Sequence, residues 1–396
     1  MIYLDNAGTT KMFEECVEVH KKFSCEQFFN PSALSEESMQ VSKLISETEK
    51  FLLKRLGASE GNILFTGCAT ESNNLAIKGS FRKGAWEYVF SEGEHPSVYN
   101  VAKKLEMDGC VVHFVPLASD GCVDLRALEK VLNEKTRLIS IMHVSNETGA
   151  INDLKKISEI KLKKCPKAIL HVDGVQGFMK IPVVLRQTAV DLYSFSGHKF
   201  HAPKGIAGLY VKNKGALKEI FQGGGQQFGL RSGTENVSGI MQLRKAVELI
   251  DEKTNFLRVS RLKNVFNSAL KENKVGLTCD DACKNLQNGA VKIENCDGVV
   301  IRDFCGSPYI ENLVFQGVKG ETMLHALNQE GVIVGLGSAC SSKKAGNRIL
   351  EKIGVSPEDI ISSVRISFNA YMTDEEVLKA AEIIKITYHK IKEKVS

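Results

Sequence analysis

The pattern that most restricts the fold of this chain is a regular alternation of short apolar runs with stretches of helical periodicity. The apolar runs predict strands at 62–66, 87–90, 111–115, 137–143, 168–172, 192–195 and 206–211. Helical spacing of apolar residues predicts helices at 36–56, 98–107, 124–133 and 154–164. Strands and helices that alternate in this way favour a mostly parallel, doubly wound sheet, with the last strand returning antiparallel. The predicted fold class is therefore α/β.

Polar side chains follow two neighbouring strands of this predicted sheet. Asp173 comes directly after 168–172, and Ser196, His198 and Lys199 come directly after 192–195. The carboxyl ends of parallel strands share one edge, which is where ligands bind. This set of side chains suits pyridoxal 5'-phosphate (PLP): the lysine amine forms a Schiff base, Ser and His hold the phosphate, and Asp keeps the pyridine nitrogen protonated.

Three other turns on the same side of the predicted sheet carry polar groups whose role the residues alone leave open. The helix start at Ala69 and Thr70 offers free backbone N–H groups to a phosphate, although most such turns are only helix caps. His95 follows the next strand, and a lone histidine is more often structural than catalytic. Asn146 follows 137–143, in what is by itself a turn.

The C-terminal half adds a glycine-rich loop, one unusual cysteine and one arginine. The loop at 223–236 is flexible and could bind an anion, but no strand–GxGxxG–helix unit surrounds it, so it is not a dinucleotide fingerprint. Cys340 alone among eleven cysteines lies among Gly, Ser and Lys, where nearby lysines favour the reactive thiolate. Arg365, in a predicted strand at 363–368, is either a surface charge on an edge or a bidentate carboxylate clamp.

The remaining elements are predicted more coarsely. A long helix from Ser238 to about Lys271 connects the predicted sheet to the C-terminal part of the chain. A strand at 310–316 and helices at 320–329 and 374–394 follow, whereas 276–307 contains no readable motif.

Several of these motifs resemble one known family. Asp173-Gly174-Val175-Gln176 followed by Ser196-Gly197-His198-Lys199 is similar to the cofactor core of the class V aminotransferases, and most similar to that of the NifS/IscS-type cysteine desulfurases. The runs 69–74, 231–236 and 337–340 match the same family in order. The resemblance implies the PLP-dependent transferase fold type I (aspartate aminotransferase-like), with a large PLP-binding domain at 14–257. A smaller α+β domain, at 1–13 and 258–396, would carry the cysteine loop.

The resemblance also implies a role for each candidate residue. It places an imidazole, His95, over the cofactor ring, and it directs Asn146 and Gln176 to the phenolic oxygen of the cofactor. It makes Arg365, with Asn146, the binding site of the amino-acid carboxylate. Thr234 would reach the phosphate of the partner subunit's cofactor, which implies a homodimer. Lys199 would remove the Cα proton, and Cys340 would accept sulfur.

The function implied is a cysteine desulfurase that converts L-cysteine to L-alanine and holds the sulfur as a persulfide on Cys340. A sulfur-acceptor protein, either an iron–sulfur scaffold or a thiolation enzyme, would then receive the sulfur. Three alternatives stay open: a selenocysteine lyase, an ordinary class V aminotransferase, or a catalytically silent sulfur-transfer partner. The chain departs from the family pattern at Gly8, Ser35 and Asn369, where Ala, His and Gly are usual.

Composition restricts the possible partners and cellular location of the protein rather than its reaction. A formal net charge of +5 over 396 residues gives no sign of direct nucleic-acid binding. The N-terminus lacks the pattern of a signal peptide, and no apolar run approaches the ~18 residues of a membrane helix. Scattered cysteines without a CxxC pair predict free thiols in a reducing cytoplasm, and no metal site.

Overall fold

The computed structural model describes residues 1–271, 291–304, 306–337 and 347–395. The larger part of the molecule, here called the large domain, is built on a seven-stranded sheet with strand order β2-β8-β7-β6-β5-β3-β4. These strands are β2 (Asn62–Thr66), β8 (Ala207–Val211), β7 (Leu192–Ser196), β6 (Ile169–Asp173), β5 (Thr136–Met142), β3 (Glu87–Ser91) and β4 (Val111–Val115). Within the described residues, only β8 runs opposite to the other six strands of this sheet. The prediction of a mainly parallel sheet with one returning strand is therefore confirmed.

Helices cover both faces of this sheet, because successive strand residues point to opposite sides. The helices are α1 (Glu15–Lys21), α2 (Glu36–Arg55), α3 (Ala69–Ser80), α4 (Pro96–Met107), α5 (Leu125–Val131), α6 (Leu154–Lys164) and α7 (Val237–Leu249). On β3, Val89 packs in one buried apolar cluster with α2, α5, α6 and α7, and Phe90 packs in another with α3 and α4. The sheet is thus doubly wound.

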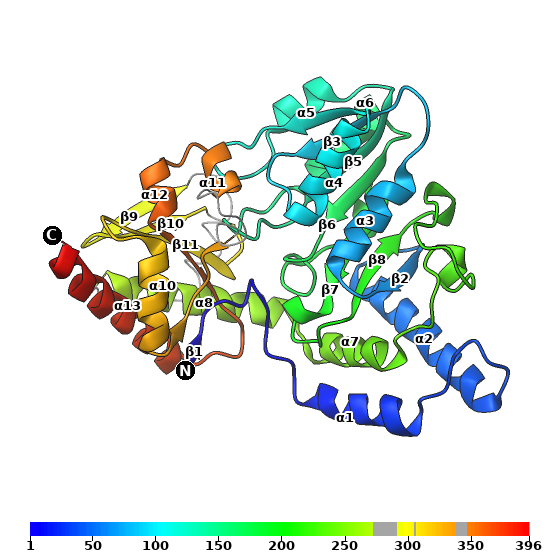
Figure 1. Cartoon of the computed structure of the whole chain (residues 1–396), viewed down its shortest axis with the longest axis horizontal. Helices are drawn as coiled ribbons and strands as arrows, with labels where there is room; N and C mark the ends of the chain where they lie inside the picture. Colours follow the sequence, from blue (N-terminus) through cyan, green and yellow to red (C-terminus); the bar gives the residue numbers. More distant parts are fainter. Residues whose placement is uncertain (272–290, 305, 338–346, 396) are drawn as a thin grey trace.

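The smaller part of the molecule, here called the small domain, holds a four-stranded antiparallel sheet and a two-stranded parallel one. Its strands are β1 (Ile2–Tyr3), β9 (Lys292–Cys296), β10 (Val299–Asp303), β11 (Ile310–Phe315), β12 (Val332–Ile333) and β13 (Ser363–Ser367). Its helices are α8 (Glu252–Leu270), α10 (Gly320–Gln329), α11 (Arg348–Lys352), α12 (Pro357–Ile361) and α13 (Asp374–Val395). β1 lies with the small domain although α1, the next helix, lies under the large one (Figure 1). The predicted domain boundary after residue 257 falls inside α8 and stays a prediction.

Two predictions about this region need correction. The single helix predicted from Ser238 to Lys271 is two helices, because Ile250 is extended (φ −96°, ψ 122°) and Asp251 caps a new helix by accepting a hydrogen bond from the Thr254 N–H. The stretch said to lack a motif contains the β9–β10 hairpin, whose turn residues Asp297 and Gly298 both have positive φ. An Asp-Gly pair between two possible strands is a strong hairpin signal, so this stretch does contain a readable feature.

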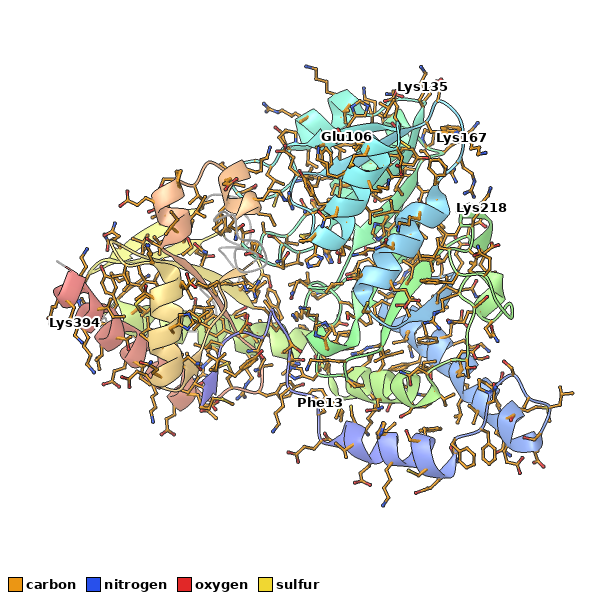
Figure 2. All side chains as sticks on the ribbon, viewed as in Figure 1. Phe13, Glu106, Lys135, Lys167, Lys218 and Lys394 are labelled. Carbon is orange, nitrogen blue, oxygen red and sulfur yellow. The ribbon has the colours of Figure 1, made fainter. Side chains whose placement is uncertain are left out.

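The outer surface is charged, and no helix in the described ranges is long and apolar enough to cross a membrane. Figure 2 shows Lys135, Lys167 and Lys218 directed outward from the large domain, and Lys394 at the far end of the small domain.

Candidate active site

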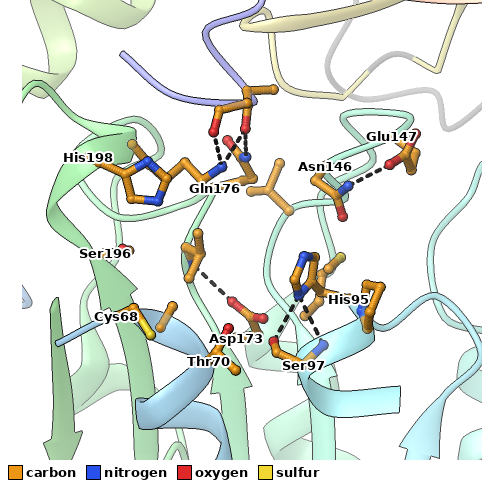
Figure 3. A pocket seen from close by; sticks show the side chains of 18 of the residues that line it. Cys68, Thr70, His95, Ser97, Asn146, Glu147, Asp173, Gln176, Ser196 and His198 are labelled. Atoms are coloured by element: carbon orange, nitrogen blue, oxygen red, sulfur yellow. Dashed lines mark hydrogen bonds between the residues drawn. The ribbon is translucent and has the colours of Figure 1, made fainter. Parts of the chain in front are cut away.

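A cavity of about 390 Å³ lies where the carboxyl ends of the parallel strands meet the small domain. Among its lining residues are Ala69, Thr70, His95, Asn146, Asp173, Gln176, Ser196, His198, Lys199 and Arg365. Figure 3 shows side chains from both sides converging on this common space, with His95 and Asp173 on one side and Gln176 and His198 on the other. Apart from Thr234, every predicted site residue that the structure describes is part of this lining.

The N-terminus of α3 forms one end of the cavity. Among the described residues, Cys68 holds the N-cap position with extended backbone, but its side chain accepts no hydrogen bond from the helix. The first backbone N–H groups of a helix are therefore left to an anion, to which the helix dipole also contributes. Ala69 and Thr70, the first residues of α3, line the cavity at this end, as do Ser196 and His198.

Asp173 ends β6 and is buried. Its Oδ2 accepts a hydrogen bond from Asn73 Nδ2 at 2.8 Å, and its Oδ1 accepts one from the Val175 N–H at 3.1 Å. These two donors fix the orientation of the carboxylate at the cavity wall.

The tautomer of His95 follows from its neighbours. Its Nδ1 accepts a hydrogen bond from the Ser97 N–H at 3.1 Å and lies 2.8 Å from Ser97 Oγ. Because a backbone N–H can only donate, Nδ1 carries no proton, and the proton of the neutral ring is on Nε2. Burial lowers the pKa of His95, against an opposing effect of Asp173. Asn73 Nδ2 also donates to Ser97 Oγ at 2.9 Å, so one network joins His95 to Asp173.

Lys199 ends a short 3-10 turn that directly follows β7. Its Nζ donates to the carbonyl oxygens of Ala7 at 2.7 Å and Gly8 at 2.6 Å, so the N-terminal segment closes this side of the cavity. Burial, assisted by Arg365, lowers the pKa of Lys199 to about 8. Burial and the neighbouring Lys199 likewise lower the pKa of His198 to about 4, so its imidazole is neutral at pH 7.

The lowered pKa of Lys199 gives a direct prediction for the cofactor-free protein. Only a neutral amine is acylated, so acetylation of Lys199 by acetic anhydride should be half-maximal near pH 8. Lys103 is the internal control, because its hydrogen bond to Glu106 raises its pKa, and it should need a higher pH. Peptide mass spectrometry across a pH series measures both lysines in one sample. Identical profiles for the two would contradict the assigned environment of Lys199.

A second lysine, Lys180, lies buried behind the cavity wall. Its Nζ donates to Gln176 Oε1 at 2.8 Å, while Gln176 Nε2 donates to the Ala7 carbonyl at 2.9 Å. Burial, with Lys199 and Arg365 nearby, lowers the pKa of Lys180 to about 7. The Gln176 amide is therefore held at both ends.

Arg365 reaches the cavity from β13 of the small domain. It is only 8% exposed, which excludes the alternative of a surface charge on an edge. Its Nη1 donates to the Asn146 carbonyl at 2.9 Å, and its Nη2 donates to Asp5 Oδ1 at 2.8 Å. Asn146 Nδ2 donates to Glu147 Oε1 at 2.6 Å, whereas the buried Asn146 Oδ1 accepts no hydrogen bond from any described residue.

Two predicted residues are not among the described residues that line the cavity. Thr234 is exposed, on the loop that precedes α7, and its predicted contact with a partner subunit stays a prediction. Cys340 lies outside the described residues, although Gly337, three positions earlier, lines the cavity.

The sequence reasoning missed four side chains of this site: Asp5, Asn73, Ser97 and Lys180. Asn73 could have been found, because it follows Ala69 by four positions and so shares a helix face with it. Ser97 and Lys180 also bond to near neighbours in sequence, His95 and Gln176. Asp5 depends on a contact with the distant Arg365, for which one sequence holds no signal.

Three comparisons with known proteins, by family model, by sequence and by structure, agree on one family. The family model of aminotransferase class-V matches residues 2–379. A cysteine desulfurase of a Nostoc species is 33% identical over 97% of this chain and 92% of its own length. A cysteine desulfurase IscS of Buchnera aphidicola is 33% identical over 99% of this chain and 94% of its own. A solved structure of a NifS-like protein superposes with a TM-score of 0.83 at 30% identity, covering 99% of both chains.

Proposed function

Because the chain belongs to the aminotransferase class-V family, among its NifS/IscS-type cysteine desulfurases, we propose that it converts L-cysteine to L-alanine and takes the sulfur onto Cys340. The predicted fold, PLP-dependent transferase type I, agrees with the same comparisons. One observation carries the proposal: a buried lysine amine, Lys199, shares a cavity with the carboxylate of Asp173, the imidazole of His95 and the guanidinium of Arg365.

The cavity residues fit PLP. The uncapped N-terminus of α3, with Ser196 and His198, suits the phosphate, and the Asp173 carboxylate suits the ring nitrogen. Asn146 Oδ1 is a buried acceptor that lacks a donor among the described residues, which is understandable where a ligand completes the site. When bound, PLP supplies an electron-withdrawing ring that stabilises negative charge at Cα of an amino acid.

Each of the cavity side chains has its own role in the proposed reaction. Arg365 and Asn146 bind the substrate carboxylate. Lys199 Nζ, whose pKa of about 8 makes a neutral amine accessible near pH 7, removes the Cα proton. His95 presents a proton on Nε2 to the cavity. The Cys340 thiolate then attacks the substrate sulfur: an S–S bond forms, the substrate C–S bond breaks, and its electron pair stays with Cβ. Protons delivered to Cβ and returned to Cα complete alanine, which leaves, and the persulfide remains on Cys340.

The further parts of the proposal concern partners and setting. The persulfide sulfur passes to an acceptor protein, either an iron–sulfur scaffold or a thiolation enzyme. The enzyme acts as a homodimer, in which Thr234 contacts the cofactor phosphate of the other subunit, and it works in the cytoplasm. The matching run 231–236 supports the dimer.

A Cys340→Ala variant tests the reaction most directly. We expect it to bind PLP as the unaltered protein does, but to lose alanine release from L-cysteine by at least about 100-fold, because the attacking nucleophile is gone. Alanine and sulfide are quantified, and the persulfide is mapped by mass spectrometry.

Cys25→Ala is the matched control, since Cys25 is an exposed thiol outside the cavity lining. It should keep full activity. Full alanine release by Cys340→Ala would show that this thiol is not needed and would contradict the desulfurase proposal, and a persulfide on another cysteine would overturn the assignment of Cys340.

A further inference from the structure

The carboxylate of Asp5 lies in a small space, here called the seat, that exists only because Gly8 and Gly335 lack side chains. A Cβ atom at Gly8 would lie 2.4 Å from Asp5 Oδ2, and a Cβ atom at Gly335 would lie 2.5 Å from Asp5 Oδ1. Neither glycine has a positive φ, so backbone conformation does not account for them. What the two positions share is the space that they leave for one carboxylate.

The backbone holds this seat beside Arg365. Asp5 forms a bridge with Ser367, two residues beyond Arg365 on β13. Gly335 pairs with Arg365 itself through hydrogen bonds of 3.0 and 2.7 Å. The Asp5 carboxylate is thereby delivered to Arg365 Nη2 at 2.8 Å.

Both terminal nitrogens of the guanidinium are engaged by protein oxygens in this arrangement. Nη2 donates to Asp5, and Nη1 donates to the Asn146 carbonyl and lies 3.7 Å from Glu147 Oε1. A bidentate carboxylate ligand needs two neighbouring N–H groups of the fork. Arg365 Nε is buried and has no hydrogen-bond partner among the described residues. A bidentate ligand can take Nε with Nη2 or Nη1 with Nη2, and in both cases it competes with Asp5 for Nη2. Asp5 is the candidate to leave, because its side chain is 26% exposed whereas that of Glu147 is 2% exposed.

We propose that Asp5 occupies, on Arg365, the place of the substrate carboxylate and is displaced when substrate binds, so that Asp5 and Gly8 set the affinity for carboxylate ligands. The exchange replaces one carboxylate by another, so the charge around Arg365 is unchanged and the released Asp5 is rehydrated. This inference rests on the proposed function for the identity of the substrate. It also accounts for Gly8, the departure from the family pattern that the proposed function leaves unexplained.

Removing the Asp5 carboxylate, which competes with the substrate carboxylate for Arg365, should increase the affinity for L-cysteine. In Asp5→Asn, which keeps the size of the side chain but loses its charge, we expect KM for L-cysteine to fall about 3- to 10-fold, the scale of a partly exposed ion pair. We expect kcat to change by less than about twofold, because the contact is absent once substrate is bound. Gly8→Ala should also lower KM for L-cysteine, because the added Cβ atom excludes the Asp5 carboxylate from the seat.

A binding measurement keeps the test independent of turnover. The probe is 3-mercaptopropionate, which has the carboxylate and thiol of cysteine but lacks the amine, titrated into PLP-loaded protein by calorimetry. Its Kd should fall by the same factor in both variants. Asp108→Asn is the matched control, because it removes an exposed ion pair with Lys104 outside the cavity lining.

Unchanged or higher KM and Kd values in both variants would overturn the inference and make Asp5 only a support for Arg365. If one variant fails to fold, the other decides. Failure of the unaltered protein to release alanine from L-cysteine would contradict the proposed function instead. The binding of 3-mercaptopropionate would still test the role of Asp5.

Discussion

Lys199→Ala is expected to lose at least about 10,000-fold in alanine release from L-cysteine, because one side chain supplies both the covalent attachment of PLP and the base. Among the described residues that line the cavity, Lys199 alone carries an amine. Lys180 cannot replace it, because its Nζ is committed to Gln176 behind the cavity wall. We further expect that borohydride no longer fixes PLP to the chain.

The control is Lys204→Ala, which removes an exposed lysine five residues away and should leave activity within about twofold. Added small primary amines should restore part of the activity of Lys199→Ala, since they can supply the missing base. A Lys199→Ala protein that keeps a tenth of its activity, or is still labelled by PLP and borohydride at one site, would contradict the assignment.

The largest effect on stability is expected at a buried charge cluster in the small domain. Lys263 of α8 lies 3.0 Å from Asp303 Oδ1 and 3.1 Å from Glu311 Oε2, and the Glu311 side chain is fully buried. Lys263→Met would leave the Glu311 carboxylate without its cation, which costs about 3–5 kcal/mol in the free energy of unfolding. Urea denaturation measures the loss, and Lys103→Met, which removes a lysine from the surface of α4, should leave the free energy of unfolding essentially unchanged.

The pH dependence of this loss identifies its cause. Burial raises the pKa of Glu311 to about 7, although Lys263 opposes the rise. A carboxyl whose pKa is higher in the folded than in the unfolded chain costs stability increasingly as pH rises from about 4.3 through the folded value. Lys263→Met raises that folded value further, so its penalty should be larger at pH 8 than at pH 5. Adding Glu311→Gln should recover much of the loss, whereas an equal penalty at both pH values would point to packing alone.

The fold was largely predictable because its signals are local. The apolar run at 62–66 and the helix pattern at 154–164 give their elements within the sequence itself, and strand β2 and helix α6 have the predicted bounds. The sequence did not predict the break between α7 and α8 at Ile250, because the capping residue Asp251 lies within otherwise continuous helical periodicity. A local capping signal there competes with the amphipathic pattern on both sides of it.

The site was predictable only where residues follow strands of one sheet. Asp173 and Lys199 both follow parallel strands, and the rule that such strand ends share an edge brings them together. Asp5 and Arg365 are 360 positions apart, and their contact depends on how β1 and β13 pack in the small domain. Side-chain partners of this kind are fixed by tertiary packing, for which periodicity and spacing contain no information.

The pairing of the N-terminal segment also affects the order in which the molecule can be completed during synthesis. Ile2 pairs with Val332, and Asn6 and Ala7 bond to Ser367, so residues that are synthesised early find their partners more than 300 positions later in the chain. Ala7 and Gly8 supply the carbonyls that hold Lys199. The large domain can therefore fold early, but the cavity cannot be closed around Lys199 until residue 367 has emerged. A nascent chain would remain an open, inactive scaffold until that point.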